Sequence, residues 1–257
     1  MSQATSVEVP EGYVKIFSRP KSLSDRRFTY CPGCHHGIVA RLIAEVIDEL
    51  GIHDRTVGIA PVGCAVFLYE FYTVDFIQAS HGRACAVATG VKRARPDLVV
   101  FSYQGDGDLA AIGTAETVHA ANRGENFTVI FVNNQVYGMT GGEMAPTTLP
   151  GQRTVTTPEG RDVHLAGYPL KMSEMLAQLE GPAYITRQSV HDARHIMLAK
   201  RAIKKAFQNQ LEGKGFSLVE IVAACPINLK MSPVEANRWI AEHAIKVFPL
   251  GDLKVKD

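Results

Sequence analysis

The chain has 257 residues, of which 46% are hydrophobic and 21% charged, and its formal net charge is +1. This length and apolar content suit one large α/β domain that can bury a substantial core. The charges are scattered and nearly balanced, and no stretch approaches the ~20 apolar residues of a membrane span, so we expect neither a nucleic acid nor a membrane as partner.

Residues 1–30 show little apolar periodicity and contain Pro10 and Pro20, which predicts an extended N-terminal arm. The start of this arm lacks an apolar signal core, so we expect a cytoplasmic protein. Five cysteines, an odd number without a secretion signal, favour metal or redox use over a disulfide framework.

Helical and strand patterns alternate beyond the arm. Apolar spacing predicts a helix over 38–50 that ends at Gly51. The following elements are a strand over 56–60, a helix of small residues between 83 and 95, a strand over 98–103, a helix over 114–121 and a strand over 127–132. This order predicts a doubly wound, mostly parallel sheet.

Residues 137–171 are rich in Gly, Pro and Thr and have no clear period, as in functional or disordered loops. Beyond them we predict a short helix near Ser173, a strand over 183–187, a helix over 192–210 and a strand over 217–222. Ser232, Pro233 and Glu235 form a capping-box signature, which predicts that a terminal helix starts there. We therefore divide the chain into an arm (1–30), an α/β domain (31–231) and a C-terminal helix and tail (232–257).

Two polar motifs follow consecutive predicted strands. Gly105, Asp106 and Gly107 follow the first strand, and Asn133 and Asn134 follow the second. Open α/β sheets bind ligands at the carboxyl ends of their strands, where a carboxylate and an amide suit Mg²⁺ and glycines admit a phosphate. Both motifs could instead be simple turns, which the paired asparagines at this spacing disfavour. The arrangement resembles the diphosphate-binding motif of thiamine diphosphate enzymes.

The cysteines suggest a second centre. Cys31 and Cys34 could be half of a zinc site, a redox pair or two ligands of an iron–sulfur cluster. A structural zinc site would require a second pair of closely spaced cysteines, whereas Cys64, Cys85 and Cys225 are each isolated in the sequence. Thiolates from distant segments suit a cubane cluster in a folded pocket.

Together these motifs resemble the β subunit of 2-oxoacid:ferredoxin oxidoreductases from Tyr30 to the terminal helix. The matching runs are residues 30–35, 63–64, 81–84, 104–107 and 133–138. The resemblance implies that Cys31, Cys34, Cys64 and Cys225 ligate one [4Fe-4S] cluster. It also implies that Asp106, Asn134 and the Val136 carbonyl hold Mg²⁺.

The expected thiamine diphosphate contacts come from the same segments. They are Val62, Gly63, Cys64, Ala65, His81, Gly82, Arg83, Gly105, Asp106, Gly107, Asp108, Asn134, Gly138 and Met139. His81 and Arg83 could alternatively cap a loop, and we interpret Cys85 as a small buried residue outside the ligand set. For His35 and His36, we favour a capping role at the helix start over hydrogen bonds to the cluster.

The resemblance implies coenzyme-A-dependent oxidative decarboxylation of a 2-oxoacid to acyl-CoA and CO₂, with electrons passing through the cluster to ferredoxin. In this family the glutamate that activates thiamine lies on a partner subunit, so we assign no catalytic residue to this chain. We expect an α subunit, a γ subunit and a small ferredoxin-like subunit as partners. Residues 140–162 resemble β subunits for branched-chain substrates, which favours 2-oxoisovalerate.

Several readings of the function stay open beside this one. Within the same family, 2-oxoglutarate and an aryl 2-oxoacid are alternative substrates. In other classes, the chain could be a subunit of a non-redox thiamine diphosphate decarboxylase or synthase, against which the cysteines argue. It could also be a non-catalytic, metal-stabilised electron-transfer subunit.

Overall fold

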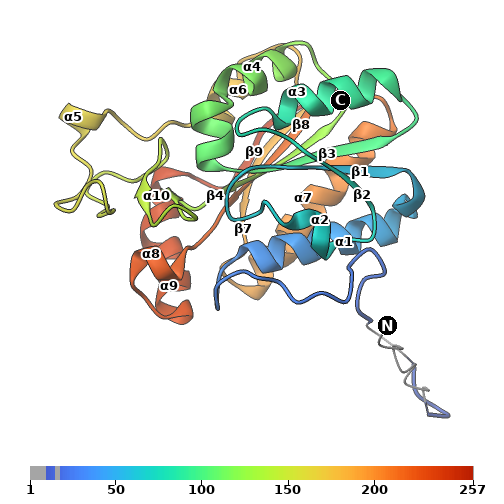
Figure 1. Ribbon diagram of the computed structural model, residues 1–257, viewed down its shortest axis with the longest axis horizontal. Helices are drawn as coiled ribbons and strands as arrows, with labels where there is room; N and C mark the ends of the chain where they lie inside the picture. Colours follow the sequence, from blue (N-terminus) through green and yellow to red (C-terminus); the bar gives the residue numbers. More distant parts are fainter. Residues whose placement is uncertain (1–9, 15–17, 257) are drawn as a thin grey trace.

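The computed structural model describes residues 10–14 and 18–256 and contains a seven-stranded sheet with helices on both faces (Figure 1). Of the predicted arm, residues 1–9 and 15–17 lie outside the described residues. The strands, in spatial order, are β2 (Asp75–Gln78), β1 (Thr56–Ala60), β3 (Val99–Gly105), β4 (Thr128–Asn133), β8 (Ser217–Val222), β7 (Tyr184–Ser189) and β9 (Gly251–Val255). Neighbouring strands are parallel except for β7 and β9, which confirms the doubly wound, mostly parallel sheet.

Two layers of helices cover the sheet. One face carries α1 (His36–Leu50), α2 (Leu68–Phe71) and α7 (Ala193–Leu211), and the other carries α3 (Ala84–Ala94), α4 (Thr114–Asn122) and α6 (Met172–Ala177) (Figure 1). Each face of the sheet packs against its helices in an apolar core. Along β3, Phe101 and Tyr103 belong to the core under α1, α2 and α7, and Val100 belongs to the core under α3, α4 and α6. Because both faces are buried, the central strands consist largely of apolar residues.

Several elements were not predicted. The edge strands β2 and β9 are two of them, and the helix after Gly105 begins as a π-helix, η2 (Gly107–Ile112), rather than as an α-helix. The remaining ones are η1 (His53–Arg55), α2, the hairpin of β5 (Val136–Tyr137) and β6 (Glu143–Met144), α5 (Val163–Ala166), α8 (Pro226–Leu229), the π-helix η3 (Ile240–Ala244) and α10 (Ile245–Val247).

The long segment between β4 and α6 is folded around one buried arginine. The guanidinium of Arg161, whose residue is 5% exposed, donates to six main-chain carbonyl oxygens at 2.8–3.3 Å. These oxygens belong to residues 145, 146, 148, 166, 167 and 168. The aperiodic segment that contains α5 therefore has a polar centre in place of an apolar core.

The terminal helix α9 (Pro233–Trp239) starts as predicted. The Ser232 hydroxyl accepts from the Glu235 N–H, and the Glu235 carboxylate accepts from the Ser232 N–H at 2.9 Å, which completes the capping box. Behind α9, Ile240 and Phe248 pack against Leu149 in a third apolar core. Among the described helices, none has the length and apolar character required to cross a membrane.

Candidate functional site

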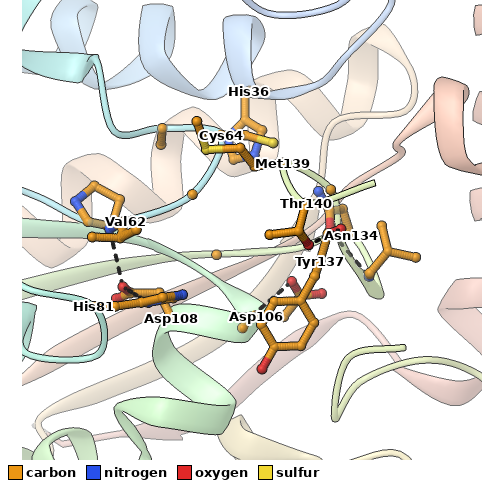
Figure 2. A pocket seen from close by; sticks show the side chains of 17 residues that line it. His36, Val62, Cys64, His81, Asp106, Asp108, Asn134, Tyr137, Met139 and Thr140 are labelled. Atoms are coloured by element: carbon orange, nitrogen blue, oxygen red, sulfur yellow. Dashed lines mark hydrogen bonds and ion pairs between the residues drawn. The ribbon is translucent and has the colours of Figure 1, made fainter. Parts of the chain in front are cut away.

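A cavity of about 130 Å³ opens at the carboxyl ends of β1, β3 and β4 (Figure 2). Five segments far apart in the sequence meet there, and four of them follow the parallel strands β1, β2, β3 and β4, which end at the same edge of the sheet. Its lining consists of His36, Pro61, Val62, Gly63, Cys64, Ala65, His81, Gly105, Asp106, Gly107, Asp108, Asn134, Val136, Tyr137, Gly138, Met139 and Thr140.

Asp106 is one of the two buried carboxylates that line this cavity. It directly follows β3, caps η2 and is 3% exposed. Its carboxylate accepts from the Gly107 N–H at 3.2 Å and from the Thr147 hydroxyl at 2.8 Å. Burial nevertheless raises the pKa of Asp106 to about 7. A divalent cation would favour the charged carboxylate, and the amide oxygen of Asn134 in the same lining is a second ligand of the kind that Mg²⁺ prefers.

The backbone beside Asp106 lies close against an aromatic ring. A Cβ atom on Gly107 would lie 2.1 Å from the Tyr137 ring, so glycine is the residue that this approach tolerates. Gln135 has a φ of 63°, a left-handed conformation that non-glycine residues seldom adopt. Strained backbone of this kind concentrates at functional sites and persists only where its surroundings hold it in place.

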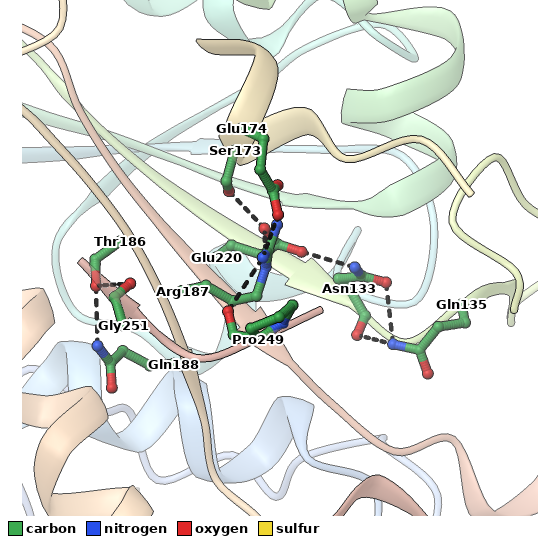
Figure 3. Close-up of polar contacts among 10 residues, drawn as sticks. All are labelled: Asn133, Gln135, Ser173, Glu174, Thr186, Arg187, Gln188, Glu220, Pro249 and Gly251. Carbon is green, nitrogen blue, oxygen red and sulfur yellow. Dashed lines mark hydrogen bonds and ion pairs between the residues drawn. The ribbon is translucent and has the colours of Figure 1, made fainter. Parts of the chain in front are cut away.

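A buried polar chain holds the turn at Gln135 (Figure 3). The Gln135 side-chain amide donates to the Asn133 carbonyl at 2.6 Å, and the Asn133 side-chain amide donates to Glu220 at 2.7 Å. Arg187 donates to Glu220 at 2.8 Å and also pairs with Glu174. Because the side chains of Arg187 and Glu220 are each 1% exposed, each charge depends on its partner for compensation.

Asp108 joins three loops. Its carboxylate accepts from the Val62 N–H at 3.2 Å, the Gly82 N–H at 3.0 Å, the His81 imidazole at 2.7 Å and the Gln104 side chain at 2.6 Å. The hydrogen bond to His81 is visible at one side of the cavity in Figure 2. With four donors already in place, Asp108 fixes the loops after β1 and β2 relative to β3.

Four cysteines gather next to the cavity. A Cβ atom on Gly138 would lie 3.2 Å from the Cys64 sulfur and 3.8 Å from the Cys225 sulfur. Burial raises the pKa of Cys34 to about 12 and that of Cys64 to about 11. Negative charge on Cys31 and Cys225 would add to both shifts, which places these two sulfurs near Cys34 and Cys64. Iron would supply the positive charge that favours the thiolate forms.

Comparison with known proteins identifies the family of this chain. The thiamine pyrophosphate enzyme, C-terminal TPP binding domain family matches residues 61–221. The 2-oxoglutarate synthase subunit KorB of Archaeoglobus fulgidus is 35% identical over 214 residues, which are 83% of this chain and 76% of that relative. The chain belongs to the 2-oxoacid:ferredoxin oxidoreductase family.

Two further relatives of this oxidoreductase-family chain extend the comparison. The ketoisovalerate oxidoreductase subunit VorA of Methanothermobacter thermautotrophicus is 50% identical over 248 residues, which are 96% of the chain and 52% of VorA. The chain therefore spans about half the length of that relative. A structure of 2-oxoglutarate:ferredoxin oxidoreductase from Magnetococcus marinus, with 2-oxoglutarate, coenzyme A and succinyl-CoA bound, superposes with a TM-score of 0.76 at 25% identity. The superposition covers 96% of this chain and 87% of the Magnetococcus marinus chain.

Most of the contacts predicted from the sequence line the cavity of this oxidoreductase-family chain. Gly82 and Arg83 do not: Gly82 binds Asp108, and Arg83 pairs with Glu116 at 2.7 Å on the neighbouring helix. The ligand roles of the whole set stay predictions. Cys85 is fully buried beside Gln104, in agreement with its interpretation as a small buried residue.

Some residues of the site were not anticipated. His36 lines the cavity and shares a hydrogen bond of 2.7 Å with the Tyr103 hydroxyl, whereas we expected a capping role. His35 is bonded to Asn237, and neither histidine provides a side-chain cap for α1. The Thr147 hydroxyl reaches Asp106 from the long segment, where the sequence carries no sign of such a role.

Proposed function

We propose that this chain is the thiamine diphosphate-binding β subunit of a 2-oxoacid:ferredoxin oxidoreductase. The activity is the coenzyme-A-dependent oxidative decarboxylation of a 2-oxoacid to acyl-CoA and CO₂, with electrons passing to ferredoxin. One observation carries the proposal: hard oxygen ligands and soft thiols meet around a single cavity. Asp106 and Asn134 lie in its lining, and the sulfurs of Cys64 and Cys225 face Gly138 in the same lining.

The residues present suit the implied cofactors. Asp106, Asn134 and the Val136 carbonyl would hold Mg²⁺, and Gly105, where an added Cβ atom would meet nothing within 4 Å, would admit a diphosphate. Cys31, Cys34, Cys64 and Cys225 would ligate one [4Fe-4S] cluster. When bound, thiamine diphosphate supplies the decarboxylation chemistry and the cluster accepts single electrons. The chain orients these groups, and Asn228 contributes an N–H that donates to the Cys225 sulfur at 3.1 Å.

Completion of the active site requires a partner. The carboxylates in the lining are Asp106 and Asp108, and the latter already accepts four hydrogen bonds. No glutamate lines this cavity within the described residues, so we propose that an α subunit supplies the residue that activates thiamine. A γ subunit and a small ferredoxin-like subunit would complete the complex.

For the substrate we propose a branched-chain 2-oxoacid, 2-oxoisovalerate. Within the described residues, the cavity lining contains no Lys or Arg that would pair with the second carboxylate of 2-oxoglutarate. Met139, which is 55% exposed, offers an apolar contact at the same cavity. The identity to the ketoisovalerate relative, 50%, also exceeds the 35% to the 2-oxoglutarate relative from Archaeoglobus fulgidus.

The test is anaerobic, coenzyme-A-dependent viologen reduction by the native complex with 2-oxoisovalerate, pyruvate, 2-oxoglutarate and phenylglyoxylate. We expect the highest kcat/KM for 2-oxoisovalerate. An Asp106→Asn complex is the control and should lose thiamine diphosphate and activity while keeping its iron.

Each other outcome has a defined meaning. Preference for 2-oxoglutarate or phenylglyoxylate would keep the family activity and refute the substrate assignment. Absence of viologen reduction in a complex that binds thiamine diphosphate would refute the redox proposal in favour of a non-redox enzyme. A complex without thiamine diphosphate would indicate an electron-transfer subunit.

A further inference from the structure

A second group of metal-ligand side chains lies where β7 leads into α7. His191 and Asp192 precede the helix, and His195 lies in its first turn. One donor atom from each residue lies within 4.8 Å of the other two. In the part of the chain that the structure describes, no other group of three or more His, Cys, Asp or Glu residues is this close.

Each ring nitrogen of His191 lies close to a side-chain oxygen atom. The Ser189 hydroxyl donates its single hydrogen to the Val222 carbonyl at 2.9 Å. When this hydroxyl donates to Val222, it accepts from His191, whose Nδ1 lies 3.0 Å away. In that tautomer of neutral His191 the proton is on Nδ1, and the lone pair on Nε2 faces the Asp192 carboxylate at 3.4 Å.

In this tautomer two acceptors face each other, and a cation between them would satisfy both. Two ligands of a tetrahedral Zn²⁺ at ~2.1 Å stand roughly 3.4 Å apart, which fits the observed separation of Nε2 and the Asp192 oxygen. The hydrogen bond from Nδ1 to Ser189 is the outer contact that metal-ligating histidines usually make.

His195 completes the set from one helical turn further on. Its ring centroid lies 4.2 Å from that of His191, and its Nδ1 lies 2.8 Å from the second Asp192 oxygen. That oxygen also accepts the His195 main-chain N–H at 2.8 Å as the cap of α7. One Asp192 oxygen thus caps the helix, and the other is available as a metal ligand. Its negative charge offsets the unfavourable field of the helix N-terminus on a cation.

We propose that His191, Asp192 and His195 form a binding site for a divalent transition-metal ion of the Zn²⁺ type. Two imidazoles and one carboxylate suit Zn²⁺ and discriminate against Mg²⁺, which prefers oxygen ligands. The Asp192 side chain is 49% exposed, so water can reach the fourth position. The ion would tie the end of β7 to the first turn of α7, independently of the thiamine cavity.

The test measures Zn²⁺ binding to the assembled complex under anaerobic conditions, by competition with a chromophoric zinc chelator. Iron content is determined before and after, so that zinc at the cysteines is recognised as lost iron. The variants are His195→Gln and Asp192→Asn. Asparagine is as good a helix cap as aspartate, so Asp192→Asn removes the charge and keeps the cap.

A matched control is His53→Gln. His53 also lies beside an aspartate, with its Nδ1 2.8 Å from Asp54, but no second imidazole joins that pair. We expect the wild type and His53→Gln to bind one more Zn²⁺ per chain than either test variant, or to bind it at least about tenfold more tightly. Mg²⁺ in place of Zn²⁺ should show no such difference.

Equal Zn²⁺ binding by the wild type and both test variants would overturn the proposal. So would a wild type that binds no Zn²⁺ while its iron content is unchanged, because His191 and Asp192 would then form a simple hydrogen-bonded cap. Neither outcome affects the proposed oxidoreductase activity.

Discussion

Glu220→Gln should separate the two roles of the buried polar chain in Figure 3. The change removes a charge from a side chain that is 1% exposed and leaves its size almost unchanged. The new amide cannot satisfy both neighbours, because Arg187 and Asn133 both donate to residue 220. One donor will face another donor in either orientation of the glutamine.

The size of the effect follows from burial. Removal of one partner from a buried ion pair costs about 3–5 kcal/mol, and we expect the lower end because Arg187 keeps its pair with Glu174. Glu174→Gln is the matched control. The Glu174 side chain is 35% exposed, so water replaces its carboxylate and the cost should be about 1 kcal/mol. For a chain of this size, these costs correspond to losses in Tm of roughly 6–12 °C and 2–4 °C.

The second effect concerns the metal. Asn133 anchors the turn that carries Asn134, so loss of its acceptor should raise the half-saturating Mg²⁺ concentration about tenfold or more. Thermal scans at one fixed rate and calorimetric titrations with thiamine diphosphate at several Mg²⁺ concentrations measure the two effects on the assembled complex. High Mg²⁺ should restore cofactor binding in Glu220→Gln, and Glu174→Gln should need no such increase.

Equal losses of Tm in the two variants, with the same Mg²⁺ dependence as the wild type, would refute this reasoning. The polar chain would then be a packing feature of β7 and β8 without influence on the turn.

Three further outcomes follow from the site. Gly107→Ala should abolish thiamine diphosphate binding in calorimetry, because its Cβ would lie 2.1 Å from the Tyr137 ring. Cys225→Ser should lower the iron content of the complex, whereas Cys85→Ser should leave it unchanged; equal iron in both would contradict the ligand assignment. Because burial raises the pKa of Asp106 from 3.8 to about 7, the folded carboxyl keeps its proton below that pH and Mg²⁺ must displace it. The half-saturating Mg²⁺ concentration should therefore rise about fivefold from pH 7 to 6 and roughly tenfold per pH unit below pH 6, and a flat profile would exclude Asp106 as a ligand.

Burial explains which strands the sequence made predictable. Strands β3, β4 and β8 are buried on both faces and consist largely of apolar residues, whereas β2 is mostly exposed and β9 alternates polar and apolar residues at the sheet edge. Short edge strands resemble loops because one side has no pairing partner and little apolar surface.

The candidate site divides in the same way. Asp106 and Asn134 stand directly after strands, so their meeting follows from the parallel sheet alone. The hydrogen bond from Thr147 to Asp106 joins residues 41 positions apart, and no local pattern indicates it. Arg187 did carry a signal, since a charged residue in a buried strand requires a partner, but the identity of that partner in another strand is a property of the fold.

The arginine that organises the long segment also determines how this segment opens. Arg161 donates to carbonyls before it in the chain, at residues 145, 146 and 148, and after it, at residues 166 and 168. If either group of residues moved away alone, several buried N–H donors of Arg161 would lose their acceptors. Residues 145–168 should therefore detach as one cooperative unit, and their amide hydrogens should exchange together. Because this unit carries Thr147, its opening would expose Asp106 to water in the same event.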